Sequence, residues 1–202
     1  MAIIQPPAPF RLRGAKWRLL STVQRNRSEW TKRSKGIAQP GADMWTVSGD
    51  FVTIVGADRA LPWKAFYFAL RGSANAFRVR AVEQQQTTAA NPTARAGGTA
   101  GTTIPLQGLP ASSTVLKAGM MMTVTLPSGH ERLVGLVAPL VSNGQGQGTA
   151  TFAPELGEIP AAGAAVEIQW PWALVNQSNE PPGWDVAEGQ TYSFRVDAEE
   201  AL

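Results

Sequence analysis

The feature that most constrains the fold of this chain is an apolar side chain at every second position in several short segments. Residues 77–80, 166–170 and 192–197 each alternate apolar side chains with polar or charged ones. Because successive side chains of a strand point to opposite faces of a sheet, each segment is typical of a half-buried antiparallel strand. Further apolar runs at 120–126, 133–141 and 149–152 are separated by glycine-containing turns, which predicts a β-meander.

One segment breaks this period. Pro62 stands where a helix would begin, and Gly72 stands where it would end. Between them, large apolar side chains recur at helical spacing: Trp63, Phe66, Tyr67 and Leu70. We therefore predict one short helix over residues 63–71. Closer to the N-terminus, we expect strands near residues 16–19 and 29–35, and a hairpin over 44–55 whose turn is Ser48-Gly49-Asp50.

Two interruptions divide the chain. Residues 84–103 are small, polar and rich in Gly and Thr, which is typical of a linker or exposed loop. A second interruption spans residues 176–183 and contains Pro181-Pro182-Gly183. The fold class expected is mainly β: residues 1–83 plus 176–202 form an antiparallel β-sandwich or barrel with one short helix, and residues 104–175 form a small inserted β-barrel.

The residue types available exclude much of catalytic chemistry. The chain has no cysteine, which removes disulfides, thiolate metal sites and thiol nucleophiles. Its one histidine, His130, lies in an expected turn and would have to serve any histidine-based triad or zinc site alone. An all-carboxylate site stays open on residue types, with four candidate acids in loops: Glu155, Glu158, Asp185 and Glu188. We predict no catalytic, metal-binding or cofactor-binding residues, hence no enzyme and no cofactor.

Glycines and tryptophans allow two further comparisons. The glycine-rich stretches 97–101 and 143–148 lack the Lys-Ser/Thr and the strand-to-helix setting of a phosphate loop, so we interpret them as linker and turn. Of seven tryptophans, Trp17, Trp45 and Trp170 share alternating apolar faces and are expected in cores. Trp30 and Trp184 lack that pattern. They keep open a non-catalytic carbohydrate-binding β module or a protein that stacks nucleic-acid bases.

Charge is distributed unevenly. Residues 1–80 carry 14 Lys plus Arg against 4 acids, whereas residues 81–202 carry 4 against 11, within a net charge of +3. Such polarity suits nucleic-acid binding, and it also suits head-to-tail docking of identical subunits, which we favour because no dense basic patch is interleaved with aromatics. The predicted subunit-interface residues are a basic set and two acids on a neighbouring copy: Arg25, Arg27, Lys32, Arg33 and Lys35 with Glu199 and Glu200.

The order of motifs resembles a known family. Residues 63–79, WKAFYFALRGSANAFRV, resemble a segment of small tail proteins in phages of Gram-negative bacteria, where a short helix leads into a strand of the belt domain. Segments at 116–120, 132–134, 152–156 and 160–166, and the acid-rich end after Phe194, are similar to such proteins as well.

The resemblance implies a distal tail or baseplate-type structural protein. Such a subunit forms a ring, typically sixfold, that joins the tail tube to the hub or receptor-binding apparatus, and its small β domain faces outward. It would be made in the host bacterial cytoplasm and reside in the virion. Its partners would be itself and other tail proteins, such as tube, hub, receptor-binding or fibre proteins. DNA would be met only on passage through the channel. A tail adaptor or nozzle subunit is the alternative within the same class. No apolar run approaches membrane-spanning length, so no membrane partner is expected.

Overall fold

The computed structural model describes residues 1–8, 12–39, 41–51, 53–178 and 183–201. Those residues are mainly β, with one α-helix, as the alternation predicts. The chain divides into two compact units, and both are discontinuous in sequence. The first unit comprises residues 1–18, 45–80 and 172–202, and the second comprises residues 19–44 and 81–171. No helix in the described part of the chain is long and apolar enough to cross a membrane.

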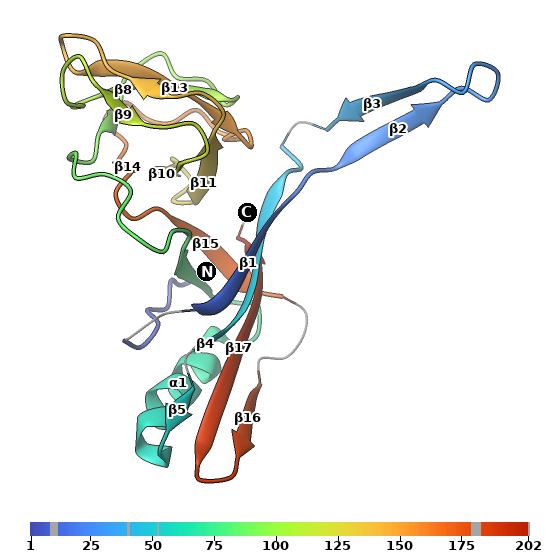
Figure 1. The fold of residues 1–202 in the computed structure, drawn as a ribbon, viewed down its shortest axis with the longest axis vertical. Coiled ribbons are helices and arrows are strands. Elements are labelled where there is room, and N and C mark those ends of the chain that lie inside the picture. The colour runs from blue at the N-terminus through green and yellow to red at the C-terminus, as the bar shows by residue number, and fades with distance from the viewer. Residues whose placement is uncertain (9–11, 40, 52, 179–182, 202) are drawn as a thin grey trace. The chain divides into compact units, whose positions relative to one another are not determined.

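The first unit is a seven-stranded sheet with a helix packed on it (Figure 1). Its elements are β1 (Leu12–Leu20), β4 (Met44–Phe51), β5 (Ile54–Val55), α1 (Ala57–Leu70), β6 (Ala76–Arg80), β15 (Trp172–Gln177), β16 (Trp184–Ala187) and β17 (Thr191–Glu200). The main path runs β1-β4-β17-β15-β6. Strand β17 is its organising member: β5 and β16 pair with its first half, and β4 and β15 pair with its second half.

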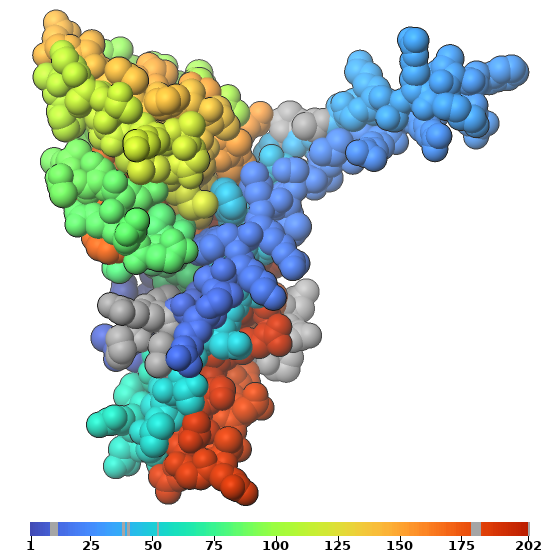
Figure 2. Space-filling view, in the orientation of Figure 1, coloured from blue at the N-terminus to red at the C-terminus, as the bar shows by residue number. Residues whose placement is uncertain are grey.

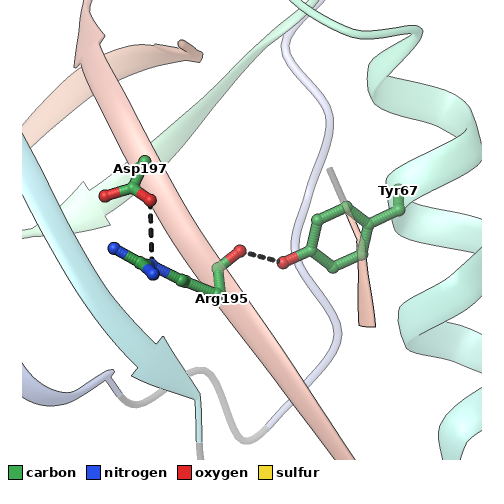
Figure 3. Close-up of polar contacts among 3 residues, drawn as sticks. All are labelled: Tyr67, Arg195 and Asp197. Atoms are coloured by element: carbon green, nitrogen blue, oxygen red, sulfur yellow. Dashed lines mark hydrogen bonds and ion pairs between the residues drawn. The ribbon is translucent and has the colours of Figure 1, made fainter. Parts of the chain in front are cut away.

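An aromatic core joins α1 to this sheet. Trp63 and Tyr67 on α1 lie 5.7 and 5.6 Å, centroid to centroid, from Phe194 of β17. The Tyr67 hydroxyl also donates a hydrogen bond of 2.5 Å to the Arg195 carbonyl oxygen, while the Arg195 side chain pairs with Asp197 at 2.9 Å (Figure 3). Burial, with the Asp197 charge adding to it, raises the pKa of Tyr67. The helix is therefore fixed by packing and by one directed bond.

Two local predictions for this unit are wrong. The helix begins at Ala57 and contains Pro62, so the proline does not mark its start. Ser48-Gly49-Asp50 does not turn: β4 continues through it, because all three residues pair with Arg195–Asp197 of β17. Gly49 also lets β1 approach, since a Cβ there would lie 3.3 Å from the Ala15 Cα and the Arg13 carbonyl oxygen. Pairing with distant strands overrides the local turn preference.

The second unit contains a curled six-stranded antiparallel sheet. Its elements are β7 (Thr93–Ala94), β8 (Thr103–Gln107), β9 (Thr114–Leu116), β10 (Met121–Thr125), β11 (Glu131–Leu136), β12 (Leu140–Val141), β13 (Gln147–Ala153) and β14 (Val166–Glu167). The order is β14-β10-β11-β13-β8-β7, and β9 pairs with β12. Ile104, Met122, Leu140 and Phe152 are among the fully buried side chains of its core.

The expected linker, residues 84–103, belongs to this second unit. Strand β7 lies within it and pairs with β8. The Gln86 side chain donates to the Met121 carbonyl oxygen at 2.7 Å and accepts from the Met121 N–H at 2.9 Å. At the other end, residues 172–175 fall outside the barrel, because they belong to β15 and pair with β6 in the first unit. Polar composition suggested a linker, but the polar side chains bond back onto the barrel.

Candidate functional site

The basic residues predicted to form an interface lie on one hairpin, which we call the arm (residues 23–38). It consists of β2 (Val23–Arg27) and β3 (Ser34–Ala38), which pair antiparallel in a two-stranded sheet of their own (Figure 1). Its loop is closed by the Ser28 and Arg33 backbones, at 2.9 Å from N to O, and by the Ser28 Oγ, which accepts from the Thr31 N–H at 3.2 Å. The arm is thus a hydrogen-bonded hairpin with a closed loop.

The side chains of the arm are open to solvent on both faces. Every residue from 20 to 37 is exposed, and the space-filling view shows these side chains at the molecular surface (Figure 2). The five predicted basic residues are all among them: Arg25, Arg27, Lys32, Arg33 and Lys35. Glu29 is the one acid in the arm, so its formal charge is +4. The structure brings together on one element the residues that sequence reasoning grouped.

The tip of the arm carries a feature that the sequence left open. Trp30 lies in the loop between β2 and β3 and is 95% exposed, the largest exposed fraction among the exposed large apolar side chains of the described chain. An indole with almost its whole surface in water buries no apolar area, so it does not stabilise the fold of its own subunit. Tryptophan and arginine are the side chains that most often dominate binding energy at protein interfaces. The tip therefore has the composition of a binding anchor.

Physical stability also favours a partner for the arm. A two-stranded hairpin with no buried face is marginally stable in water, because it removes little apolar surface from solvent. Both outer edges of the arm also present backbone N–H and C=O groups that another chain can bond. A bound partner would supply the burial that the arm lacks.

The two predicted acids differ in their availability. Glu199 is exposed on β17. Glu200 is only 3% exposed, and its carboxylate accepts a hydrogen bond of 3.2 Å from the Trp45 N–H, across the sheet of the first unit. Glu200 does not suit the predicted role of pairing with a neighbouring copy, because its charge is buried within its own subunit. Alternation along β17 places these adjacent residues on opposite faces.

The candidates for catalytic chemistry do not converge. His130 follows a turn, where its N–H donates to the Ser128 Oγ at 3.3 Å. Glu158 accepts from the Ser128 N–H at 3.1 Å, so it supports that same turn. Asp185 and Glu188 lie in the other unit, on β16 and on the turn after it. Within the described residues, no three His, Cys, Asp or Glu side chains form a group able to hold a metal ion.

The second glycine-rich stretch forms the expected turn. The Asn143 Oδ1 accepts from the backbone N–H groups of Gln145 and Gln147, at 2.9 and 3.0 Å. Gly146 adopts a φ of 68°, and a Cβ there would collide with the Leu109 carbonyl oxygen. Gly146 therefore permits close packing of the backbone in this turn.

Comparison of the sequence with models of known protein families finds no match. Comparison with curated proteins finds no match either. Any proposal of function must therefore rest on the geometry of each unit and on the sequence itself.

Proposed function

We propose that this protein is a structural subunit of a phage tail that assembles as a ring between the tail tube and the hub or receptor-binding apparatus. The observation that carries the proposal is the arm: a hairpin of charge +4, exposed on both faces, with a bare tryptophan at its tip. An element of this kind suits docking on another protein surface. The tail assignment itself rests on the resemblance of residues 63–79 to tail proteins.

In the proposed ring, the arm of one copy docks on the next copy, and the contact repeats until the ring closes. A contact between two different surfaces of identical subunits generates a ring when the rotation closes. The basic arm meets acids of the neighbour, among which Glu199 is exposed. The ring contact then joins the arm, which belongs to the second unit, to the first unit of the neighbouring copy, and the barrel corresponds to the outward domain.

Native mass spectrometry and negative-stain microscopy of the purified full chain test this proposal. We expect a closed oligomer, with six copies as the leading expectation, that dissociates as salt rises from about 0.1 to 1 M because screening weakens exposed charge pairs. A chain that stays monomeric at high concentration, together with virions that lack the ring, would refute the proposal.

Charge reversal in the arm provides a matched comparison. The variant R27E/R33E should lose the oligomer, because it turns two cations of the arm into anions. The variant R95E/K117E makes the same charge change at two exposed positions of the barrel and serves as the control for altered net charge. Equal loss of the oligomer in both variants would show that net charge alone, and not the arm, governs assembly.

A second candidate function from another class is carbohydrate binding, which the exposure of Trp30 favours. A flat, solvated aromatic ring is a platform on which sugars stack. A glycan array with the wild-type protein and with Trp30→Ala separates the two functions: binding that depends on Trp30 would support a glycan-binding module. Duplex DNA at low salt belongs in the same screen, because a basic arm binds phosphates most strongly there.

A further inference from the structure

The outward face of α1 is unusually apolar for a helix on a protein surface. Leu61, Ala65 and Phe68 are exposed at spacings i, i+4 and i+7, so they form one stripe along the helix. Leu61 is 57% exposed and Phe68 is 67% exposed. The opposite face packs on the sheet through Trp63, Phe66 and other buried residues. A helix that is apolar on both faces is normally buried on both, so the stripe marks a surface to be covered.

Strand β16 extends this stripe into a patch. The Phe68 ring lies 6.0 Å from the ring of Trp184, edge to face, and Trp184 is half-buried. Val186, two residues on, is 57% exposed and pairs with Tyr192. The Lys64 ammonium lies 5.2 Å from the Trp184 ring and 4.8 Å from the Tyr192 ring, which ties helix and strand together. We call this surface the α1–β16 patch (Leu61, Ala65, Phe68, Trp184 and Val186).

We propose that the α1–β16 patch is the receptor for the arm tip of a second copy of this chain, with Trp30 seated between Leu61, Phe68 and the edge of β16. This inference rests on the proposed ring and names the contact that closes it. Trp30 is an anchor that the second unit leaves 95% exposed, and the patch is an apolar surface that the first unit leaves exposed. Hot-spot aromatics bind where such desolvated apolar surfaces receive them.

Charge at one end of the patch is complementary to the charge of the arm tip. Arg27, Lys32 and Arg33 flank Trp30 and outnumber the neighbouring Glu29. The patch itself carries Lys64 beside Trp184, and Arg59 follows Asp58. At one end of the patch, Asp58 lies in the first turn of α1, and the backbone N–H of Gly56 just before it donates to the Gln190 carbonyl oxygen at 3.0 Å. That bond brings the β16–β17 turn, with exposed Glu188, to the same end. Basic groups at the rim of a docked tryptophan would thus meet carboxylates.

The dimensions are compatible as well. At about 3.3 Å per residue in β2 and less in the loop, the arm reaches at most about 23 Å from Val23 to Trp30. On the same scale, β17 spans about 26 Å from Glu199 to Thr191, beside Glu188. An arm laid along β17 of the neighbour would place its base near Glu199 and its tip near the patch. One docking mode therefore accommodates both the predicted acid and the new receptor.

Mixing two assembly-defective variants tests the contact. Trp30→Ala removes the anchor, and Phe68→Glu disrupts the receptor; each should weaken the contact between subunits by about 30-fold or more, the scale of a hot spot. Phe68→Glu is compatible with the fold, because residue 68 is exposed and a glutamate there lies one turn from Lys64. Far-ultraviolet circular dichroism and thermal unfolding verify that both variants fold.

Each variant alone is expected to be monomeric in native mass spectrometry. A one-to-one mixture keeps one intact contact, the arm of the Phe68→Glu chain on the patch of the Trp30→Ala chain, so it should give heterodimers that cannot close into a ring. The control Val137→Glu, an equally drastic change at a 60% exposed apolar residue of the second unit, should form the wild-type ring.

The outcomes separate this inference from the proposed function. Rings that persist in Phe68→Glu, or a mixture without heterodimers, would overturn the patch as receptor and leave the ring intact as a proposal. Homodimers of Trp30→Ala alone would show that two patches pack on each other, which also overturns the inference. A wild-type chain that never associates refutes the ring, and the inference with it.

Discussion

Two hairpins of this protein pair five residues with five in antiparallel register, yet their surroundings are opposite. In β10–β11, Met121–Thr125 pair with Glu131–Gly135, and most of these side chains are buried, with Met122, Val124 and Val134 in the barrel core. In β2–β3, the arm, all side chains from 23 to 37 are exposed. Backbone pairing is the same in both, so the difference between the two hairpins lies in what their side chains contact.

The comparison separates what the fold uses from what an interaction uses. Burial of apolar area stabilises β10–β11 within the subunit, at about 25 cal/mol per Å². The arm contributes no such area to its own subunit, so its composition is free to meet another requirement. Its cations and its tryptophan follow the pattern of interface residues, and substitutions there should leave the subunit stable while changing what it binds.

The largest expected effect on stability is in the buried hairpin. Met122 is fully buried in the barrel core, and Met122→Ala should lower the free energy of unfolding by about 3 kcal/mol, through lost burial and the cavity left behind. Chemical denaturation of the monomer measures this. A loss below about 1 kcal/mol would indicate that the barrel collapses around the gap, or that the core is less tightly packed than described.

A smaller effect is expected at a buried charge in the same hairpin. Arg132 of β11 is 2% exposed and donates from Nε to the Glu155 carbonyl oxygen at 3.1 Å and from Nη2 to the Asp43 carbonyl oxygen at 2.6 Å. Arg132→Met should cost about 2 kcal/mol, because it leaves these acceptors without that donor. Arg25→Met, the same change in the arm, is the control and should be nearly neutral. Equal effects at both positions would contradict the comparison.

A still smaller effect on stability is expected at Tyr67, which fixes α1 to β17. Tyr67→Phe should cost about 1 kcal/mol at pH 7, since it removes the hydrogen bond to the Arg195 carbonyl. Because burial raises the pKa of Tyr67, the unfolded chain ionises first, and the wild type loses stability as pH rises above about 10. The advantage of the wild type over Tyr67→Phe should therefore shrink between pH 9 and 11. A constant advantage would show that Tyr67 ionises equally in both states.

The smallest effect is expected in the arm itself. Ile37→Ala should change the unfolding free energy of the monomer by less than about 0.5 kcal/mol, because the side chain is exposed. Limited trypsin digestion gives the corresponding kinetic measurement: Lys32 and Arg33 in the loop should be cut early in the monomer and protected in the oligomer. Resistance of the monomer to cutting there would show that the arm is already covered by its own subunit.

Sequence alone predicted the parts of the fold where one face of a strand is buried. The alternation over 192–197 corresponds to β17, and the turn at 127–129 joins β10 to β11. The arm escaped a full prediction: a strand was expected only near 29–35, whereas the structure has β2, a loop and β3. A hairpin that is exposed on both faces has no alternation of apolar and polar residues. The sequence pattern that identifies half-buried strands is therefore absent there.

The candidate site was predicted in its charges but not in its geometry. The sequence contains the cluster of Lys and Arg between 25 and 35, and it also shows that Trp30 lacks the alternating pattern of a core residue. The burial of Glu200 follows the alternation of Phe194 and Val196 along β17, but no local pattern reveals its hydrogen-bond partner, the Trp45 N–H. The same holds for the α1–β16 patch, because the helical spacing of Trp63, Phe66 and Leu70 indicates the core face and is silent on whether the other face is covered.

The pairing of β6 with β15 has a consequence for how this protein can change. Arg80 lies opposite Trp172, so residues 81–171 leave and re-enter the sheet at directly facing positions, as the loop of an ordinary hairpin would. The sheet is compatible with any segment between β6 and β15 that returns the chain in register. Exposed hairpin loops tolerate the insertion of whole domains. We therefore expect that residues 81–171 can be replaced by a short turn or by another domain without a change in the strand register of the first unit.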